Sequence, residues 1–372
     1  MSETVIALLG TCDMPTDGVE EYCEYLGAAL RAHQFDLKIK RVGWSEEGWS
    51  KALKTLRQES RSWHGQWVLV QYTALAWSSR GFPFRFRNVL QILRKAGARV
   101  GVIFHDAEPY GGSRWIDKIR RAAQVSTMRA ALGAGDLAVV TIPLEKTSWL
   151  NNTKQIAGRA VFIPVGANIP PELLSVAKET SGARGPLRVA VYVITGGKNT
   201  SREVEEIVKA VRAASSKVKN LQLSAFGRRA DDAESQLRDG LHGLPVDVRV
   251  QGVLPVERVK EELCSSDVLL FVRGQISSRR GSAIAGIACG LPVIAYRGSE
   301  TAAPITDAGV VLVSRDNPAE LGEALTQVLT NESYRASLAA KSVAAQQKYF
   351  SWSAIASRFA EELRVREISP GK

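Results

Sequence analysis

The residues best suited to bind a negatively charged ligand gather in one segment of the second half of the chain. An apolar run, Asp267–Arg273, leads into a loop with two arginines and then into a run of small residues that predicts a helix. A helix that begins at the carboxyl end of a parallel strand presents unpaired N–H groups and its positive dipole end to an anion, and arginine adds charge and paired donors. The pattern predicts a diphosphate site, with Ser282 as the N-cap of the helix. The alternative is a tightly packed helix beside two solvated arginines. The residues predicted to bind the diphosphate here are Arg279, Arg280, Gly281 and Ser282.

Two further loops of the second half also stand after a predicted strand. Gly196, Gly197 and Lys198 form the first, and we predict that Lys198 meets the same diphosphate. This signal is weak, because the spacing is not that of a P-loop and a solvent-exposed turn explains it equally well. Arg228 follows the next predicted strand and is a weaker candidate for the same role.

The beginning of the chain has a glycine in a comparable place. Asp17, Gly18 and Glu20 follow the first apolar run and open an amphipathic helical pattern. Glycine lets a backbone come close to a ligand, and we predict that these three residues face an acceptor. A plain turn between a strand and a helix is an equally good interpretation.

A histidine ends another apolar run of the first half. In RVGVIFHD, His105 and Asp106 stand where a central strand is predicted to finish. Functional residues of parallel sheets lie at such strand ends, and histidine titrates close to neutral pH. We predict a catalytic role for both residues; a structural histidine, hydrogen-bonded at the strand end, is the alternative.

The elements that must position these residues alternate along the chain. Short apolar runs are followed by helical patterns in both halves, which predicts βαβ units and parallel sheets. The stretch Ile169–Pro186 interrupts the alternation with prolines, glycines and no strand, so we place a domain boundary there. The chain is predicted to form two Rossmann-like α/β domains, residues 1–168 and 169–350, followed by a helix in 351–372.

One run of the second half resembles a known family. The sequence SAIAGIACGLPVIAYRGSE, from Ser282 to Glu300, resembles the donor-domain signature of the family-4 retaining glycosyltransferases with the GT-B fold. The agreement is close over the eight residues from Ala288 to Ala295. The family's two glutamates, separated by seven residues, are absent, and Ser277 and Ala285 stand at their positions.

The resemblance extends over nearly the whole chain and implies a fold and an activity. It implies two Rossmann-like domains whose parallel sheets face each other across a cleft, the first binding the acceptor and the second a nucleotide sugar. Thr16–Tyr22 resembles the family's glycine-rich loop, and His105 the histidine that reaches the transferred sugar. Tyr349–Trp352 resembles the start of the closing helix, so that residues 351–372 are expected to pack back on the first domain.

The implied reaction is transfer of a hexose with retention of configuration. The donor is expected to be a UDP-, GDP- or similar nucleotide sugar. The acceptor is expected to be a glycan, a lipid-linked or a small molecule, as in cell-envelope polysaccharide biosynthesis.

Neither a metal nor a cofactor is expected. Helix dipoles and basic side chains can neutralise a leaving diphosphate, and the sequence holds no Asp-x-Asp motif. The four cysteines have no metal-ligand spacing, and we expect free thiols in a reducing cytosol. They are Cys12, Cys23, Cys264 and Cys289.

The charge balance favours acidic partners. The net charge is +11, which suits nucleotide diphosphates or anionic lipids. Basic residues beside Phe84, Phe86 and Trp115 favour contact with an anionic membrane surface, with a solvated helix face as the alternative. We expect a cytoplasmic protein, with peripheral attachment to the inner face of the membrane as an option. The N-terminus is predicted as a strand and not as a signal peptide, and no nucleic-acid-binding module is present.

Two other functions were compared with glycosyl transfer. A nucleotide-dependent oxidoreductase would need a G-x-G-x-x-G turn after the first strand, which the sequence lacks. A non-catalytic partner of another glycosyltransferase remains the alternative, because a fold does not by itself imply activity and both family glutamates are missing.

Overall fold

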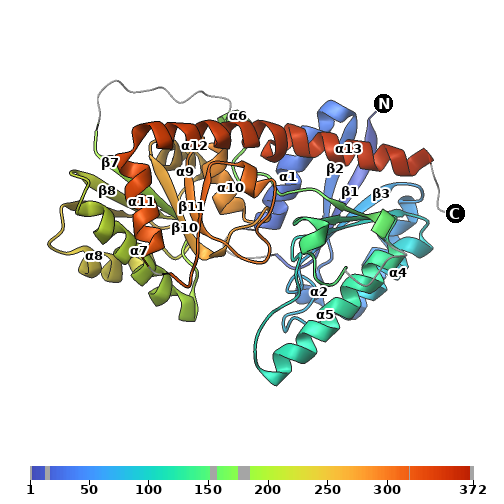
Figure 1. Cartoon of the computed structure of the whole chain (residues 1–372). Helices are drawn as coiled ribbons and strands as arrows, with labels where there is room; N and C mark the ends of the chain where they lie inside the picture. The colour runs from blue at the N-terminus through green and yellow to red at the C-terminus, as the bar shows by residue number, and fades with distance from the viewer. Residues whose placement is uncertain (1, 13–16, 151–156, 175–184, 318, 369–372) are drawn as a thin grey trace. The chain divides into compact units, whose positions relative to one another are not determined.

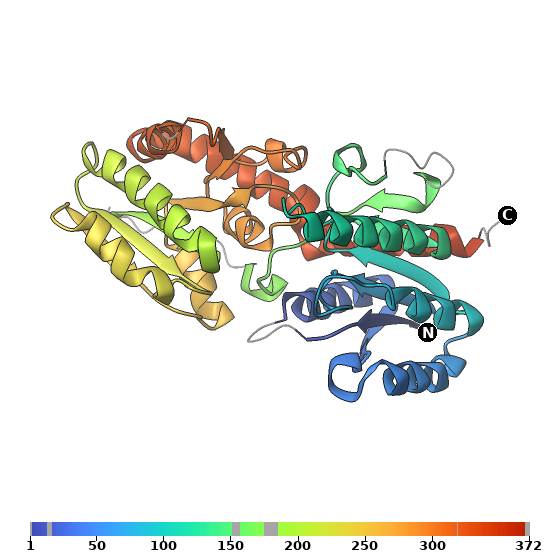
Figure 2. The ribbon, with the colours of Figure 1, turned by 90° about the horizontal axis from the view of Figure 1, so that it is seen from below.

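The computed structural model describes residues 2–12, 17–150, 157–174, 185–317 and 319–368 (Figure 1). It divides the chain into two compact units: unit 1 comprises Met1–Val165 and Trp352–Lys372, and unit 2 comprises Gly166–Ser351. Each unit is built on one six-stranded parallel sheet flanked by helices, as the views in Figures 1 and 2 show. The predicted fold class, two Rossmann-like α/β domains, is confirmed.

The sheet of unit 1 has the strand order β2-β1-β3-β4-β5-β6. Its strands are β1 (Glu3–Leu9), β2 (Phe35–Arg41), β3 (Trp67–Tyr72), β4 (Arg99–Phe104), β5 (Leu137–Val140) and β6 (Ala160–Phe162). Its helices are α1 (Gly18–Leu30), α2 (Trp44–Glu47), α3 (Trp49–Glu59), α4 (Phe86–Lys95), α5 (Trp115–Ala134) and α13 (Trp352–Ile368).

The sheet of unit 2 has the order β12-β11-β10-β7-β8-β9. Its strands are β7 (Leu187–Tyr192), β8 (Leu221–Phe226), β9 (Val246–Val250), β10 (Val268–Gln275), β11 (Val293–Tyr296) and β12 (Val310–Val313). Its helices are α6 (Pro171–Leu174), α7 (Thr200–Ser215), α8 (Glu234–Leu241), α9 (Val256–Cys264), α10 (Gly281–Ala288), α11 (Glu320–Thr330) and α12 (Glu332–Ala345), and the π-helix η8 (Gln346–Phe350) follows α12.

The sequence of each strand reflects its place in the sheet. Every residue of the inner strands β3 and β8 is buried, because helices cover both faces of a parallel sheet. The edge strands β2 and β9 alternate between more and less buried residues. Their sequences, FDLKIKR and VDVRV, alternate apolar and charged residues in the same way, as a strand with one wet face requires.

Helix α13 packs on unit 1, although it follows unit 2 in the sequence. Its side chains Ile355, Phe359 and Leu363 are fully buried. The guanidinium groups of Arg364 and Arg366 donate hydrogen bonds to the carbonyl oxygens of His33 and Asp136. The helix is thereby held by apolar burial along one face and by charged donors at its end.

Both sheets have a point at which the strand order reverses. In unit 1 the chain leaves β1 toward β2 and then returns to β3 on the other side of β1. In unit 2 the series β7, β8, β9 runs one way from β7 and the series β10, β11, β12 runs the other way. Ligands of open parallel sheets bind at the carboxyl ends of the strands beside such a point, so two places are singled out by topology alone.

Candidate functional site

In unit 2 the reversal point lies between β7 and β10, and α10 begins in the loop that follows β10. The N-cap of α10 is Arg280, without a side-chain cap hydrogen bond. The prediction that Ser282 is the N-cap is therefore wrong. A turn with a hydrogen bond from Arg280 N to Ser277 O (3.1 Å) brings the chain into the helix two residues earlier. Ser282 lies in the first turn instead, and its Oγ accepts a hydrogen bond from Nη1 of Arg273 at 3.3 Å.

The carboxyl end of α10 is closed by a Schellman motif. Gly290 has a φ of +71°, its N–H donates to the carbonyl of Ile287 at 2.9 Å, and the N–H of Leu291 donates to that of Gly286 at 3.0 Å. Glycine adopts this left-handed conformation without steric cost. The short helix is thus fixed at its end, and its N-terminus is held in place beside β10.

Arg279, predicted to bind the diphosphate, is already paired inside unit 2. Its Nε and Nη2 donate to the two carboxylate oxygens of Glu300, both at 2.8 Å. Glu300 is only 4% exposed and also accepts from Oγ of Ser277 at 3.0 Å. Burial raises the pKa of Glu300, but the hydrogen bonds and charge of Arg279 outweigh it and hold the pKa below its ordinary value. This pairing argues against a direct phosphate role for Arg279 and assigns it to holding the loop.

Arg273 is the basic residue of this region that the sequence analysis missed. It stands near the carboxyl end of β10, and its buried Nε has no hydrogen-bond partner among the described residues. Burial lowers the pKa of its guanidinium, with the nearby charge of Glu203 opposing and that of Arg228 adding to the effect. A half-buried guanidinium that forms no ion pair with a described carboxylate is costly, and an arriving anion would relieve that cost.

The other predicted donor-binding residues belong to the loops that follow β7, β8 and β10, at the same edge of the sheet. Arg228 lies close enough for its charge to act on Arg273. Nη2 of Arg280 lies 3.9 Å from where a Cβ of Gly274 would stand. Gly281 begins α10. Lys198 lies in the 3₁₀ turn Gly197–Asn199 after β7, but its side chain is outside the described residues. The carboxyl edge of the unit 2 sheet is therefore basic at its reversal point.

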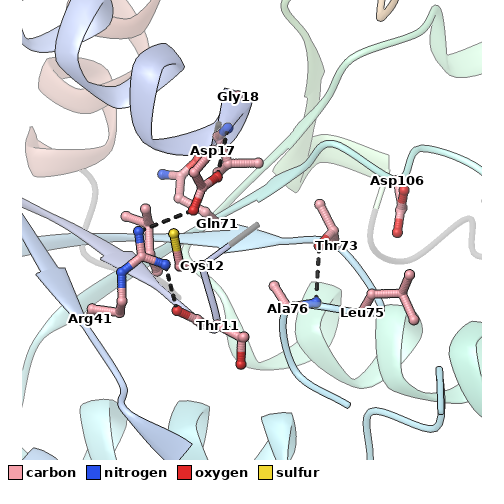
Figure 3. A pocket seen from close by; sticks show the side chains of 13 residues that line it. Thr11, Cys12, Asp17, Gly18, Arg41, Gln71, Thr73, Leu75, Ala76 and Asp106 are labelled. Atoms are coloured by element: carbon pink, nitrogen blue, oxygen red, sulfur yellow. Dashed lines mark hydrogen bonds and ion pairs between the residues drawn. The ribbon is translucent and has the colours of Figure 1, made fainter. Parts of the chain in front are cut away.

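In unit 1 the reversal point between β1 and β3 holds a cavity of about 370 Å³ (Figure 3). Its walls come from the segments that follow β1 and β3, from the start of α1 and from the end of β2. The turn after β1 needs glycine, because a Cβ on Gly10 would lie 2.2 Å from the carbonyl oxygen of Ala76. The lining residues are Leu9, Gly10, Thr11, Cys12, Asp17, Gly18, Val19, Arg41, Gln71, Thr73, Leu75, Ala76 and Asp106.

The predicted residues Asp17, Gly18 and Glu20 lie at or beside this cavity. Oδ1 of Asp17 caps α1 by accepting from the N–H groups of Val19 and Glu20. The guanidinium of Arg41, which the sequence analysis missed, bonds Asp17 at 3.1 Å and Glu20 at 2.9 Å. A Cβ on Gly18 would meet nothing within 4 Å. Asp17 therefore has a structural task, and Gly18 leaves the start of the helix open.

His105 lies behind the cavity wall and contacts Gln71, which lines it. Nε2 of Gln71 donates to the carbonyl of Leu69, so its Oε1 must accept, and His105 Nε2 donates to it at 2.8 Å. The ring of Tyr22 packs edge-on against the imidazole, with centroids 4.8 Å apart. Burial lowers the pKa of His105 to about 4, although the negative charge of Asp17 acts to raise it. The histidine is therefore neutral at physiological pH and positions Gln71.

Asp106 itself lines the cavity, and its Oδ2 accepts a hydrogen bond from the N–H of Ala74 at 2.7 Å. The sequence placed Asp106 correctly at a strand end, since β4 finishes at Phe104. It could not place Gln71, which belongs to β3 and meets His105 only through the pairing of the two strands. An amide within an otherwise apolar run, WVLVQY, is the one feature of the sequence that could have drawn attention to Gln71.

One group of side chains in this region has the types that bind metal ions. Ligand atoms of Cys12, Asp17 and Glu20 lie within 4.8 Å of one another. Arg41 occupies the position of a cation there, since it bonds both carboxylates. The donor set is therefore neutralised by the chain itself, and the geometry gives no support for a metal at this place.

The comparisons with known proteins concern the sequence of unit 2 and the fold of the whole chain. Residues 190–331, most of unit 2, match the family model described as "Glycosyl transferases group 1". The basic edge around Arg273 and α10 lies within these matched residues. None of the curated proteins compared matches the chain in sequence.

Solved structures similar to the whole chain have the GT-B fold. HepE of Anabaena, crystallised with UDP and glucose, is 13% identical with a TM-score of 0.64, over 98% of this chain and 100% of its own. Sucrose-phosphate synthase from Thermosynechococcus elongatus is 18% identical with a TM-score of 0.66, over 98% of each chain. A putative UDP-N-acetylglucosamine 2-epimerase from Listeria monocytogenes is 13% identical with a TM-score of 0.64, over 98% of this chain and 96% of its own. At these identities the likeness shows the fold, which the present chain shares.

The Glu300 pair leads to a prediction about stability. Glu300→Gln removes the negative charge to which Arg279 and Ser277 donate hydrogen bonds. The free energy of unfolding should fall by about 2 kcal/mol. This is less than for a fully buried pair, because Arg279 reaches solvent. Urea unfolding measures this. Glu261→Gln, which breaks the exposed pair with Arg258, is the control and should cost less than about 0.5 kcal/mol. Equal effects of the two changes would show that the Glu300 pair does not hold the loop.

Proposed function

We propose that the protein is a glycosyltransferase that moves a hexosyl group from a nucleoside diphosphate sugar to an acceptor, with retention of configuration and without a metal. The observation that carries the proposal is the basic edge of unit 2, where the half-buried Arg273 lies beside the first turn of α10. This edge belongs to the region that matches the glycosyltransferase family. The family match also favours transfer over the epimerisation that the shared fold allows.

The residues of this edge support charge neutralisation of the leaving diphosphate. Arg273, Arg280 and the N–H groups that open α10 would bind its oxygens, with Arg228 and Lys198 adding positive charge. Fixed donors of this kind stabilise developing negative charge without reorganisation. Asp106 lines the cavity of unit 1 and would accept a hydrogen bond from an acceptor hydroxyl. His105 would act through Gln71 as a positioning residue.

The direct test is nucleotide binding followed by turnover. A panel of UDP, GDP, ADP and their sugars is added to the purified protein, and the melting temperature and the release of nucleoside diphosphate are measured. A ligand at 100 times its dissociation constant should stabilise the fold by about 2.7 kcal/mol. Stabilisation with release supports the transferase, and stabilisation without release under any acceptor supports the non-catalytic partner. No stabilisation by any nucleotide contradicts both.

We further propose that the acceptor is a glycan or lipid-linked molecule reached at an anionic membrane surface. Near the start of α5, Trp115 is 72% and Ile119 49% exposed, and Arg114 and Lys118 beside them are exposed too. The acidic residue of this turn, Asp117, is buried and paired with Arg114 and Arg120. Exposed apolar anchors with basic neighbours bind anionic lipid headgroups. Among the described residues, none of the helices combines the length and apolar character that crossing a bilayer requires.

Vesicle sedimentation tests this surface. The protein should pellet with vesicles that contain phosphatidylglycerol and stay in solution with pure phosphatidylcholine or in high salt. The double change Trp115→Ala and Ile119→Ser should weaken binding about tenfold or more, because it removes the apolar anchors. Val253→Ser removes an apolar side chain of similar exposure in unit 2 and should leave binding unchanged. Equal losses in both variants, or no binding by the native chain, would refute the membrane proposal.

A further inference from the structure

The cavity of unit 1 has an unusual charge balance for a protein with a net charge of +11. Two of its lining residues are aspartates, Asp17 and Asp106, and one is an arginine, Arg41. Glu20 adjoins it and bonds the same arginine. Three carboxylates and one guanidinium thus lie at or beside a space of about 370 Å³, a volume suited to a small ligand.

The guanidinium in this cavity is already used. Nη1 of Arg41 donates to the carbonyl of Gly10 at 2.9 Å, and Nη2 bonds the carboxylates of Asp17 and Glu20. A phosphate or carboxylate ligand would have to take Arg41 from two carboxylates and would lie against their negative charge. Like charges brought together in a partly desolvated site repel each other strongly, as at mismatched interfaces, so such a ligand is disfavoured.

The remaining lining groups suit hydroxyl groups. Figure 3 shows Asp106 on one side of the cavity and Arg41 with Asp17 on the other, with Thr73 in the wall between Ala76 and Asp106. Oγ1 of Thr11 is buried and has no hydrogen-bond partner among the described residues. Carboxylates accept hydrogen bonds and hydroxyls both donate and accept, so a ligand with several hydroxyl groups would find partners on opposite walls.

We propose that this cavity binds a hydroxyl-rich acceptor group that is neutral or carries an ammonium group, and that it rejects phosphorylated and carboxylated groups. The acceptor role rests on the proposed glycosyl transfer, whereas the charge selectivity rests on the cavity itself. Any phosphate that links the acceptor to a lipid then lies outside the cavity. The reacting unit is a plain sugar or an amino sugar.

Cys12 provides a built-in reporter of this selectivity. It lines the cavity and is exposed, whereas Cys23 and Cys289 are buried and Cys264 is half-buried. In a Cys264→Ser background, the thiol of Cys12 is modified with a cationic and with an anionic methanethiosulfonate, and the two rates are compared with those of a free cysteine peptide. The cationic reagent should be favoured about tenfold, because a lined cleft raises the local concentration of the opposite charge.

Charge-removing variants locate the source of this preference. Glu20→Gln and Asp106→Asn should each reduce the preference at least about twofold, since each removes one carboxylate at the cavity. Glu24→Gln is the matched control, because Glu24 is exposed on the same helix α1 and does not line the cavity; it should leave the ratio unchanged. A ratio equal to that of the free peptide, or in favour of the anionic reagent, overturns the proposal.

Protection by sugars tests the ligand class with the same thiol. Glucosamine and glucose should slow the modification of Cys12, and glucose 6-phosphate should do so at least about tenfold less effectively. Equal protection by glucose 6-phosphate, or no protection by any of the three, overturns the proposal. Stabilisation by nucleotide is measured on the same protein. If nucleotide does not stabilise it while Cys12 shows the expected preferences, the result counts against the proposed transferase and not against the charge selectivity of the cavity.

Discussion

An Arg273→Met variant should lose most of its affinity for nucleoside diphosphates while its unliganded fold becomes no less stable. The side chain is half-buried and burial lowers its pKa, so methionine removes a cost to the unliganded protein. The same change removes charge-assisted hydrogen bonds worth about 2–2.7 kcal/mol to a bound diphosphate, or about 30- to 100-fold in affinity. At a concentration that stabilises the native chain by about 2.7 kcal/mol, the variant should gain only about 0.4–0.9 kcal/mol. Thermal unfolding with and without nucleotide measures both effects.

Two matched variants make the Arg273 result decisive. Arg249→Met removes an exposed arginine that pairs with Asp247 on the edge strand β9, and it should bind nucleotide as the native chain does. Arg279→Met should lower stability through Glu300 and change nucleotide affinity much less than Arg273→Met. If Arg279→Met abolishes binding and Arg273→Met does not, the diphosphate meets Arg279, and the assignment of Arg273 is wrong.

His105→Gln should make the protein more resistant to mild acid. The pKa of His105 is about 4 in the folded chain and about 6.5 when unfolded. The unfolded state therefore binds the proton first, and the native chain loses stability as the pH falls from about 6.5 to about 4. A difference of this size corresponds to about 3 kcal/mol. Urea unfolding at a series of pH values should show this loss in the native chain and not in the variant.

The exposed histidine of unit 2 provides the control for this pH series. His242→Gln should keep the native pH dependence, since His242 is exposed. An unchanged acid profile in His105→Gln would show that the imidazole is not kept neutral.

The His105→Gln variant also separates a catalytic from a positioning role of His105. A positioning role through Gln71 predicts that Gln71→Ala and His105→Gln lower kcat by similar factors and that the double variant adds little.

The strands themselves could be predicted from the sequence, because short apolar runs alternate with helical patterns in both halves of the chain. Their order in the two sheets comes from the structure. Strand order then places the residues after β1, β3, β7 and β10 at the two reversal points, where most of the predicted site residues lie. The start of α10 was misplaced by two residues, since Ser282 is a good capping residue but the turn at Ser277 sets the helix earlier. The preference of serine for the N-cap position was outweighed there by a backbone hydrogen bond that cannot be read from the sequence.

The charge pairing within the sites could not be predicted. Arg279 and Glu300 are 21 residues apart, and Arg41 and Asp17 are 24 apart, so each pair exists only because the chain brings distant segments together. Arg273 had a readable signal, an arginine that ends the apolar run DVLLFVR. Its importance depends on burial without an ion-pair partner, which only the packed structure reveals.

The place of α13 has a consequence for how the protein is made. The apolar face of α1 is covered by a helix that leaves the ribosome only after the whole of unit 2 has been synthesised. Domains that are contiguous in sequence usually finish folding in the order of translation. Here the amino-terminal half stays incomplete, with Tyr22 lacking its contact to Trp352, until the last helix arrives. Folding during translation must therefore complete the first unit last.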